Sequence, residues 1–468
     1  MIADDPALWP ATVLIEAYRR RSVSPVEATR LALDRITAVD PSLNAFTLVD
    51  PDGAIAAARE AEARWMKNEP MGLLDGVPVT IKDLLLTKGW PTLRGSKLVA
   101  KDQPWDEDAP AVARLKEHGA VILGKTTTPE FGWKAVGDSP LTGITRNPWD
   151  RSRTSGGSSA GAAVAAAAGM GALHVGTDAG GSIRIPGAFC GIVGLKPTYG
   201  RVPTYPPSPF AIVSHVGPMT RTVEDAALML TVLARADDRD ANALPPARID
   251  YREGLERGVK GLRIAFSPTL GYAKVDPEIA STVAEAARVF EQLGAIVEQK
   301  DPGFESPRDA FYTLWATGGT RLVSAFSPAQ RTQMDPGLVA MAEIGARYSA
   351  VDYLAAEAVR MQLTQHMAAF HRTYDLLLTP TVAVPALPVG QDLNDPGSER
   401  HWIDWTPFSY PFNMTRQPAV TVPCGSTRSG LPIGLQIVGR HDEDALVLRA
   451  ARAFETARPF PFPRVVPA

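Results

Sequence analysis

The amino-acid sequence predicts an α/β fold, in which short strands and helices alternate along one chain. Short segments rich in apolar and β-branched residues recur between segments whose apolar residues have helical spacing. Glycine and proline separate these segments, and no long linker, low-complexity tract or internal repeat interrupts them. This alternation is typical of strands that share a sheet and are covered by helices.

The elements follow in order from the amino terminus. Residues 11–39 predict a helical hairpin that breaks at Ser24 and Pro25, where a serine can cap one helix and a proline can begin the next. We expect strands at 76–86, 121–124, 172–176, 262–266, 295–298, 376–378, 419–422 and 434–438, and helices at 108–118, 160–170, 278–293 and 442–457. Residues 203–209 are expected to be loop, and the Pro-rich segment 382–412 a loop that borders a site.

Composition excludes several classes of protein. The 468 residues include 48 basic and 51 acidic ones, a net charge of −3 that predicts no nucleic-acid partner. Cys190 and Cys424 stand far apart, so we expect no disulfide and a reducing compartment. The start of the chain, MIADDPALWP, lacks the order of a secretory signal, which favours the cytoplasm. The uncharged run 160–175 is too short and too rich in Ala and Gly to predict a membrane span.

Two glycine-flanked serines, Ser158 and Ser182, stand at the two ends of a predicted helix and strand. A serine that attacks a carbonyl needs a base to take its proton. None of the seven histidines stands beside these serines, His366 and His371 are spaced poorly for a shared metal, and the G-x-S-x-G motif is absent. The sequence therefore gives no support for a serine–histidine hydrolase.

Lys82 is the alternative base, because it closes the apolar segment Val77–Ile81 and burial would favour its neutral form. Ser158 could then relay a proton between Lys82 and Ser182. Residues 179–182 would offer backbone N–H groups to a developing oxyanion. Taken alone, GGSSAG is also typical of a capped helix, whereas the glycine motifs that bind nucleotide phosphates are absent.

The segments GVPVTIKDL, SGGSSAGAA, GTDAGGSIRIPGAFCGIVGLKPTYGRV and LPIGLQIVG strongly resemble the amidase signature family. The resemblance covers nearly the whole chain and implies a single α/β domain over 1–468, with a mixed central sheet covered by helices on both faces. A helical segment at 1–70 would pack on a signature core at 76–200. It also implies hydrolysis of a small-molecule amide without metal or cofactor, and allows a homodimer.

The family's functional residues match positions of this sequence one by one. By resemblance Lys82 is the base, Ser158 the bridge and Ser182 the nucleophile, and Gly157-Ser158 is a cis peptide. The oxyanion would be held by backbone N–H groups of Ala179, Gly180, Gly181 and Ser182. Asp178 and Arg184 are expected to pair across this loop in a structural role. Ala160 replaces a glycine of the commoner GGSSGG form, which we expect to alter helix packing only.

Aromatic residues suggest where a substrate would lie. The group Trp402, Trp405, Phe408, Tyr410 and Phe412 is either ordinary core or, by resemblance, a pocket wall that favours an apolar or aromatic acyl group. Phe131 and Trp133 come from a second such region.

Three functions remain open at this point. The first is a stand-alone amidase that forms an acyl-enzyme on Ser182. The second is the A subunit of a glutamyl-tRNA(Gln) amidotransferase, which hydrolyses glutamine for a partner subunit. Those members carry an acidic residue shortly before a P-x-N segment, whereas Thr406 stands there in this chain, with Asp404 out of register and Arg416-Gln417 following. The third is an inactive binding protein with the same fold.

Overall fold

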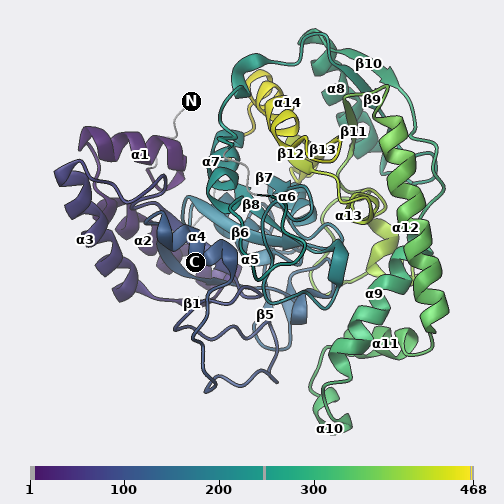
Figure 1. The fold of residues 1–468 in the computed structure, drawn as a ribbon, viewed down its shortest axis with the longest axis horizontal. Coiled ribbons are helices and arrows are strands. Elements are labelled where there is room, and N and C mark those ends of the chain that lie inside the picture. The colour runs from purple at the N-terminus through teal and green to yellow at the C-terminus, as the bar shows by residue number, and fades with distance from the viewer. Residues whose placement is uncertain (1–5, 246–248, 464, 466–468) are drawn as a thin grey trace.

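One mixed sheet of eleven strands forms the centre of the molecule (Figure 1). The computed structural model describes residues 6–245, 249–463 and 465. In spatial order the strands are β1 (Phe46–Val49), β3 (Val121–Thr126), β2 (Pro78–Lys82), β6 (Leu173–Asp178), β8 (His215–Thr220), β7 (Val193–Lys196), β12 (Ala419–Ser426), β13 (Pro432–Gly439), β11 (Leu376–Pro380), β9 (Arg263–Phe266) and β10 (Ile296–Gln299). Strand β2 is parallel to β3 and β6, and β9 is parallel to β10 and β11, whereas the other neighbours are antiparallel. The expected α/β fold with a mixed sheet is confirmed.

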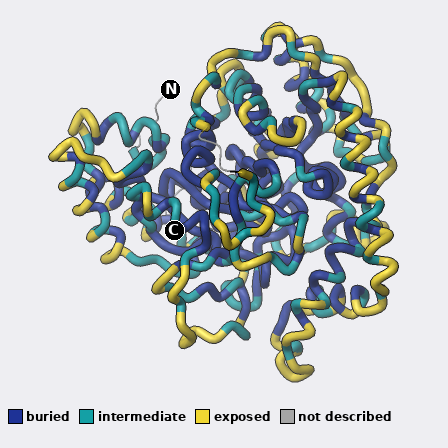
Figure 2. The backbone as a smooth tube through the Cα atoms, viewed as in Figure 1, coloured by how far each residue is buried: buried dark blue, intermediate teal, exposed yellow. Residues whose placement is uncertain are grey.

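Helices cover both faces of this sheet. They are α1 (Ala11–Arg20), α2 (Pro25–Leu43), α3 (Pro51–Lys67), α4 (Pro110–Glu117), α5 (Ala160–Ala168), α6 (Arg184–Cys190), α7 (Val223–Leu233), α8 (Pro277–Gln292), α9 (Arg308–Val323), α10 (Pro328–Arg331), α11 (Pro336–Gly345), α12 (Ala350–Phe370), α13 (Tyr410–Met414) and α14 (Asp444–Ala457). Helices α4, α7, α8 and α14 pack on one face in the largest hydrophobic cluster. Helices α5 and α6 pack on the other face. Figure 2 shows the strands between them as the most buried part of the chain.

The predicted helical hairpin is confirmed, and its break has the expected cause. Ser24 Oγ accepts the N–H of Glu27 at 3.2 Å, Glu27 Oε2 accepts the N–H of Ser24 at 2.7 Å, and Pro25 begins α2. This reciprocal cap satisfies two amides that a helix start otherwise leaves without partners. Within the predicted helical segment at 1–70, Phe46–Val49 also forms strand β1 at the sheet edge, which the sequence did not predict.

The strands and helices expected from residue 76 onward are present, with small shifts at their ends. Strands β7 and β8 of the central sheet and helices α6, α7, α9, α10, α11, α12 and α13 were not predicted. None of the described helices has the length and apolar character needed to cross a lipid bilayer. Residues 1–5, on which part of the cytoplasmic prediction depends, lie outside the described residues, as does the end of the predicted domain 1–468.

Candidate active site

Parallel strands bring the predicted base and the loop of the predicted nucleophile to the same edge of the sheet. Lys82 ends β2, Asp178 ends β6, and the register pairs Ile81 with Val175. Since the two strands are parallel, their carboxyl ends lie side by side. Ser158 and Ser159 immediately precede α5, whose first residue is Ala160.

Lys82 lies in a shell of hydroxyl groups and is fully buried. Its Nζ lies 2.8 Å from Ser158 Oγ, 3.0 Å from Ser159 Oγ and 2.9 Å from Thr177 Oγ1. Burial lowers the pKa of Lys82 well below its ordinary value, and the charge of Asp178 opposes only part of this effect. An amine in these surroundings is suited to be neutral and to accept a proton.

The neighbouring hydrogen bonds indicate which hydroxyl group the lone pair of a neutral Lys82 would face. Ser159 Oγ donates to the carbonyl of Thr177 at 3.0 Å and accepts the N–H of Thr177 at 3.2 Å, so towards Lys82 it can only accept. A neutral amine has two N–H groups and one lone pair. When the N–H groups donate to Ser159 and Thr177, the lone pair faces the hydroxyl of Ser158.

The peptide bond between Gly157 and Ser158 is cis, as the resemblance implies. A side chain at Gly157 would collide with the backbone, because its Cβ would lie 2.5 Å from the carbonyl oxygen of Val136. The N–H of Ser159 donates to the carbonyl of Ser182 at 3.1 Å, which ties the two serine loops together. Ser158 and Ser182 line one cavity. The structure therefore brings both serines to a common space, with Lys82 behind Ser158.

The loop 179–182 carries the predicted oxyanion donors, and one of them is already in use. The N–H of Gly181 donates to Asp178 Oδ1 at 2.8 Å. Gly181 has a φ of +122°, a conformation that favours glycine. Within the described chain the N–H groups of Ala179, Gly180 and Ser182 donate to no protein group. Of the four predicted donors, Gly181 is therefore the one whose N–H already has an acceptor, and the other three N–H groups are available to a ligand.

Asp178 and Arg184 form the expected pair, and both are fully buried. Arg184 Nε lies 2.9 Å from Asp178 Oδ2, and Nη2 lies 3.0 Å from Oδ1. Burial by itself raises the pKa of Asp178, but the adjacent Arg184 lowers it below its ordinary value. Arg184 also donates to Asn413 Oδ1 at 2.6 Å and to Gln436 Oε1 at 2.7 Å. The pair anchors the oxyanion loop to α13 and β13.

A cavity of about 510 Å³ adjoins the two serines. Its walls come mainly from four segments: 84–85, 94–103, 204–210 and 321–326. Phe131 lines it, as predicted. The walls formed by 94–103 and 204–210 were missed by sequence reasoning, because both are loops, and a loop has no periodic pattern that shows where its side chains point.

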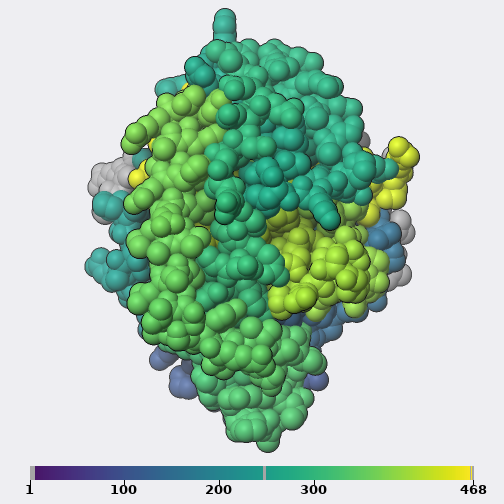
Figure 3. All heavy atoms as spheres, turned by 90° about the vertical axis from the view of Figure 1, so that its right-hand side faces the viewer, coloured from purple at the N-terminus to yellow at the C-terminus, as the bar shows by residue number. Residues whose placement is uncertain are grey.

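All the other aromatic residues that we predicted to form a pocket wall lie outside the lining of this cavity. They are Trp133, Trp402, Trp405, Phe408, Tyr410 and Phe412. Tyr410 stacks on Phe311 with ring centroids 4.8 Å apart, and Trp402 packs on Trp315 at 5.4 Å. The segment 382–412, yellow-green in Figure 3, reaches the surface beside the helices shown in green. Trp402 lies directly behind Gly180, so these rings support the oxyanion loop from outside.

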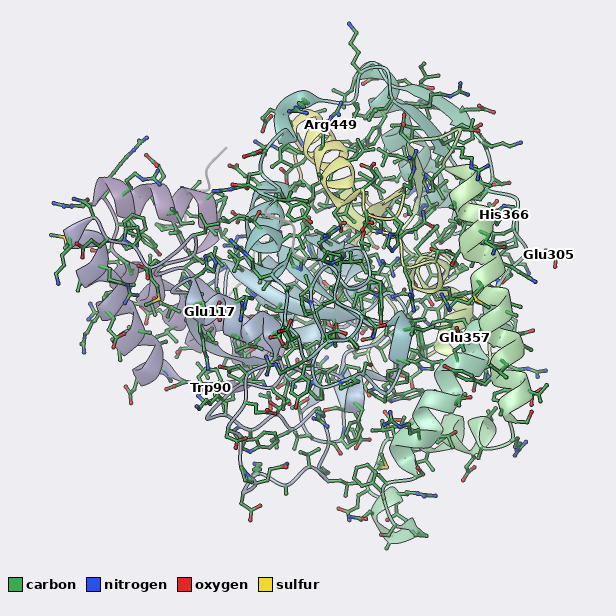
Figure 4. The ribbon with its side chains drawn as sticks, in the orientation of Figure 1. Trp90, Glu117, Glu305, Glu357, His366 and Arg449 are labelled. Atoms are coloured by element: carbon green, nitrogen blue, oxygen red, sulfur yellow. The ribbon has the colours of Figure 1, made fainter. Side chains whose placement is uncertain are left out.

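In the described part of the chain, the cavity shared by the two serines offers neither a histidine nor a metal site. None of the described residues that line the cavity is a histidine. His366 projects from α12 at the outer edge of the molecule (Figure 4), and its Nε2 lies 2.8 Å from the carbonyl of Pro302. Across the described ranges, no three His, Cys, Asp or Glu side chains gather closely enough to hold a metal ion.

Known proteins resemble this chain both in sequence and in structure. The family model described as Amidase matches residues 27–448. An acylamidase of Rhodococcus erythropolis is 39% identical over 457 residues, which cover 96% of this chain and 95% of that protein. The A subunit of a glutamyl-tRNA(Gln) amidotransferase from Myxococcus xanthus is also 39% identical, over 93% of this chain and 94% of that protein.

Among solved structures, a bacterial aryl acylamidase of the amidase signature enzymes matches with a TM-score of 0.90 at 32% identity, over 96% of each chain. The sequence motifs, the buried lysine beside two serine loops, and these similarities lead to one assignment. The chain belongs to the amidase signature family, whose activity is the hydrolysis of amides.

Proposed function

We propose that this chain is a stand-alone amidase, which cleaves the C–N bond of a linear amide through an acyl-enzyme on Ser182. The observation that carries the proposal is the position of Lys82, which is fully buried with Nζ 2.8 Å from Ser158 Oγ. A neutral amine there can drive the relay that activates a serine. The cavity walls favour an amide with an apolar acyl group.

The proposed reaction begins when Ser182 Oγ attacks the carbonyl carbon of the amide. Its proton passes to Ser158 Oγ while the proton of Ser158 passes to Lys82 Nζ. The oxyanion accepts hydrogen bonds from free backbone N–H groups of the loop 179–182. Collapse breaks the C–N bond, and the leaving amine takes the proton of Lys82 through Ser158. Water then attacks the acyl ester, loses its proton by the same route, and releases the acid and Ser182.

Substitution of Ser182 tests this proposal. Ser182→Ala should lower kcat/KM for a cleaved amide by about 10³-fold or more, because the attacking oxygen is gone. It should also abolish labelling by a fluorophosphonate. Ser281→Ala is the matched control, since Ser281 is exposed on α8 outside the cavity lining and its substitution should leave both kcat/KM and labelling unchanged. Equal labelling of the wild type and Ser182→Ala would refute the proposal, and a folded wild type that is never labelled would favour an inactive binding protein.

A glutaminase is the second candidate, because the Myxococcus xanthus amidotransferase chain is as similar to this chain as the acylamidase is. The surroundings of Asp404 count against glutamine as substrate. Its carboxylate pairs with Arg308 at 2.5 Å and accepts the N–H groups of Arg400 and His401. Thr406 is buried and its hydroxyl donates to the carbonyl of Ile403. Neither side chain is available to hold the ammonium group of glutamine.

A glutaminase assay separates the two candidates. The purified chain should hydrolyse apolar amides alone and leave glutamine unchanged. Glutamine turnover that arises only after candidate amidotransferase partner proteins are added would support the second candidate.

A further inference from the structure

The cavity beside Ser158 and Ser182 has mainly apolar walls. Leu84, Leu98, Leu322 and Phe326 are among the side chains that line it, and Phe210 closes another part of the wall. A volume of about 510 Å³ is in the range of sites that bind small molecules. The walls therefore suit a substrate with an extended apolar body.

Two arginines, Arg94 and Arg321, interrupt these apolar walls. Among the described residues that line the cavity they are the charged ones, and no acidic side chain is present there. In the part of the chain that the structure describes, neither guanidinium makes a hydrogen bond or an ion pair with the protein. Arg184, by contrast, has protein acceptors for its guanidinium on three sides. The cavity thus holds cationic donors without an acceptor of their own.

The backbone holds Arg94 in place at a conformational cost. Its φ is +57°, and Phe131, which also lines the cavity, has a φ of +53°. Such left-handed conformations are unfavourable for residues other than glycine. The N–H of Phe131 donates to the carbonyl of Arg94 at 2.7 Å, and the N–H of Arg94 donates to the carbonyl of Asp83 at 3.1 Å. Arg94 and Phe131, both in strained backbone conformations and joined by a backbone hydrogen bond, therefore line the same cavity.

A planar guanidinium binds a carboxylate through parallel charge-assisted hydrogen bonds. Arg94 is half-buried, so solvent and salt screen its charge less than that of an exposed arginine. Arg321 is exposed and adds positive charge at the cavity. Because no acidic side chain of the described lining neutralises the pair, an anionic group on the ligand is the complement that the cavity lacks.

We propose that the preferred substrate is an amide whose apolar body carries a carboxylate, and that Arg94 and Arg321 are the residues that select it. This inference rests on the proposed amidase function. It adds a class of substrate, ω-carboxylated acyl amides, to the apolar acyl group that the walls favour.

Binding to the Ser182→Ala protein tests the recognition without any hydrolysis. Suberic acid monoamide and octanamide have acyl chains of equal length and differ at the far end. Calorimetry should show that the carboxylated amide binds about tenfold or more tightly. Adding Arg94→Met should reduce the difference to within about twofold. Equal binding of the two amides, or an advantage that persists in both Arg94→Met and Arg321→Met, would overturn the inference.

Steady-state kinetics of enzyme that keeps Ser182 provide a second test of the same inference. Arg94→Met should lower kcat/KM for suberic acid monoamide about tenfold or more and leave octanamide within about twofold. Arg321→Met should cause a smaller loss, because water and salt screen an exposed charge. Arg347→Met is the matched control, since Arg347 is exposed and lies outside the cavity lining. Equal losses on both amides would contradict selection by charge.

A second pair of amides tests whether the carboxylate belongs on the acyl side or on the amine side of the substrate. N-acetyl-ω-aminoheptanoic acid and N-heptylacetamide differ by a carboxylate at the end of the amine-side chain. A preference confined to this pair would overturn the acyl-side assignment. Absence of hydrolysis in both pairs, together with tighter binding of the carboxylated amides, would refute the proposed amidase function and leave the anion recognition standing.

Discussion

Two fully buried lysines lie on neighbouring strands and differ in what surrounds them. The register of β2 and β3 pairs Lys125 with Ile81 and Lys82 with Thr126. Since successive side chains of a strand point to opposite faces, Lys82 and Lys125 lie on opposite faces of the sheet. On one face the amine meets hydroxyl groups of the serine loops, and on the other it meets a carboxylate.

The partners of the two amines set their roles. Lys125 Nζ lies 3.4 Å from Asp83 Oδ1, 2.8 Å from the carbonyl of Leu85 and 2.6 Å from Thr92 Oγ1. Burial lowers the pKa of Lys125 to about 8, and the charge of Asp83 opposes a further decrease. Burial also lowers the pKa of Lys82 well below its ordinary value, and the charge of Asp178 opposes part of this effect. Burial alone therefore does not make a base, because the neighbouring groups decide whether the amine is free to accept a proton.

The largest expected effect separates the two lysines by activity. Lys82→Met should lower kcat/KM about 10²–10⁴-fold, because it removes the proposed base while it keeps a side chain of similar volume. Lys125→Met should leave the kcat/KM of the folded enzyme within about threefold, since Lys125 contacts neither serine. Steady-state kinetics on one cleaved amide, normalised to sites labelled by fluorophosphonate, measures both. Similar losses of kcat/KM in the two variants would contradict a catalytic role specific to Lys82.

The next largest effect is on stability, where Lys125→Met should cost more than Lys82→Met. Lys125→Met should lower the free energy of unfolding by about 3–5 kcal/mol, because it leaves the carboxylate of buried Asp83 without its cation. Asp83 Oδ2 has no hydrogen-bond partner among the described residues, which increases its dependence on Lys125. Lys82→Met should cost less, since no carboxylate loses a partner. Denaturant unfolding of both variants measures this.

A double substitution is the control for that stability effect. Asp83→Asn combined with Lys125→Met should recover a large part of the loss, because no buried charge remains unpaired. A double variant as unstable as the sum of its parts would show that packing, and not the ion pair, accounts for the cost.

The pH dependence tests the same contrast. Lys82 acts as a base only when neutral, so kcat/KM should rise with pH through the pKa of Lys82 and then level off. Because burial lowers that pKa well below 10.5, the plateau should be reached well below pH 10.5. Lys125→Met should leave the acid limb of the profile in place. If the acid limb moved by about one pH unit or more in Lys125→Met, the titrating group would be Lys125 and not Lys82.

Sequence alone predicted Lys82, Ser158, Ser182 and the Asp178–Arg184 pair, because each stands in a short motif with a chemical reason for its residue types. It could not predict Thr177 beside the amine, since a threonine inside a strand has the same pattern whether its hydroxyl meets a lysine or a backbone carbonyl. Ser159 adjoins Ser158 in the motif, and that adjacency is the signal that could have found it.

The fold shows the same limit. Strands such as Pro432–Gly439 are apolar runs that any sheet must bury, so pattern sufficed to place them. His215–Thr220 contains histidine, glycine and proline, and it forms a strand because β6 and β7 supply its partners on both sides. The aromatic residues after position 400 are buried in core, because ring packing on Phe311 and Trp315 depends on helix α9, which the sequence did not predict.

The smallest predicted effect compares one threonine beside each lysine. Thr177→Val removes an acceptor for an N–H of Lys82, which frees the amine to turn its lone pair away from Ser158, so kcat/KM should fall about tenfold. Thr92→Val removes the corresponding acceptor of Lys125 and should lower the free energy of unfolding by about 1–3 kcal/mol without changing kcat/KM. Thr177→Ser, which keeps the hydroxyl, should restore activity. Since each substitution deletes one hydroxyl that contacts a lysine, a loss of kcat/KM in Thr92→Val as large as that in Thr177→Val would show that activity follows core integrity and not the orientation of one amine.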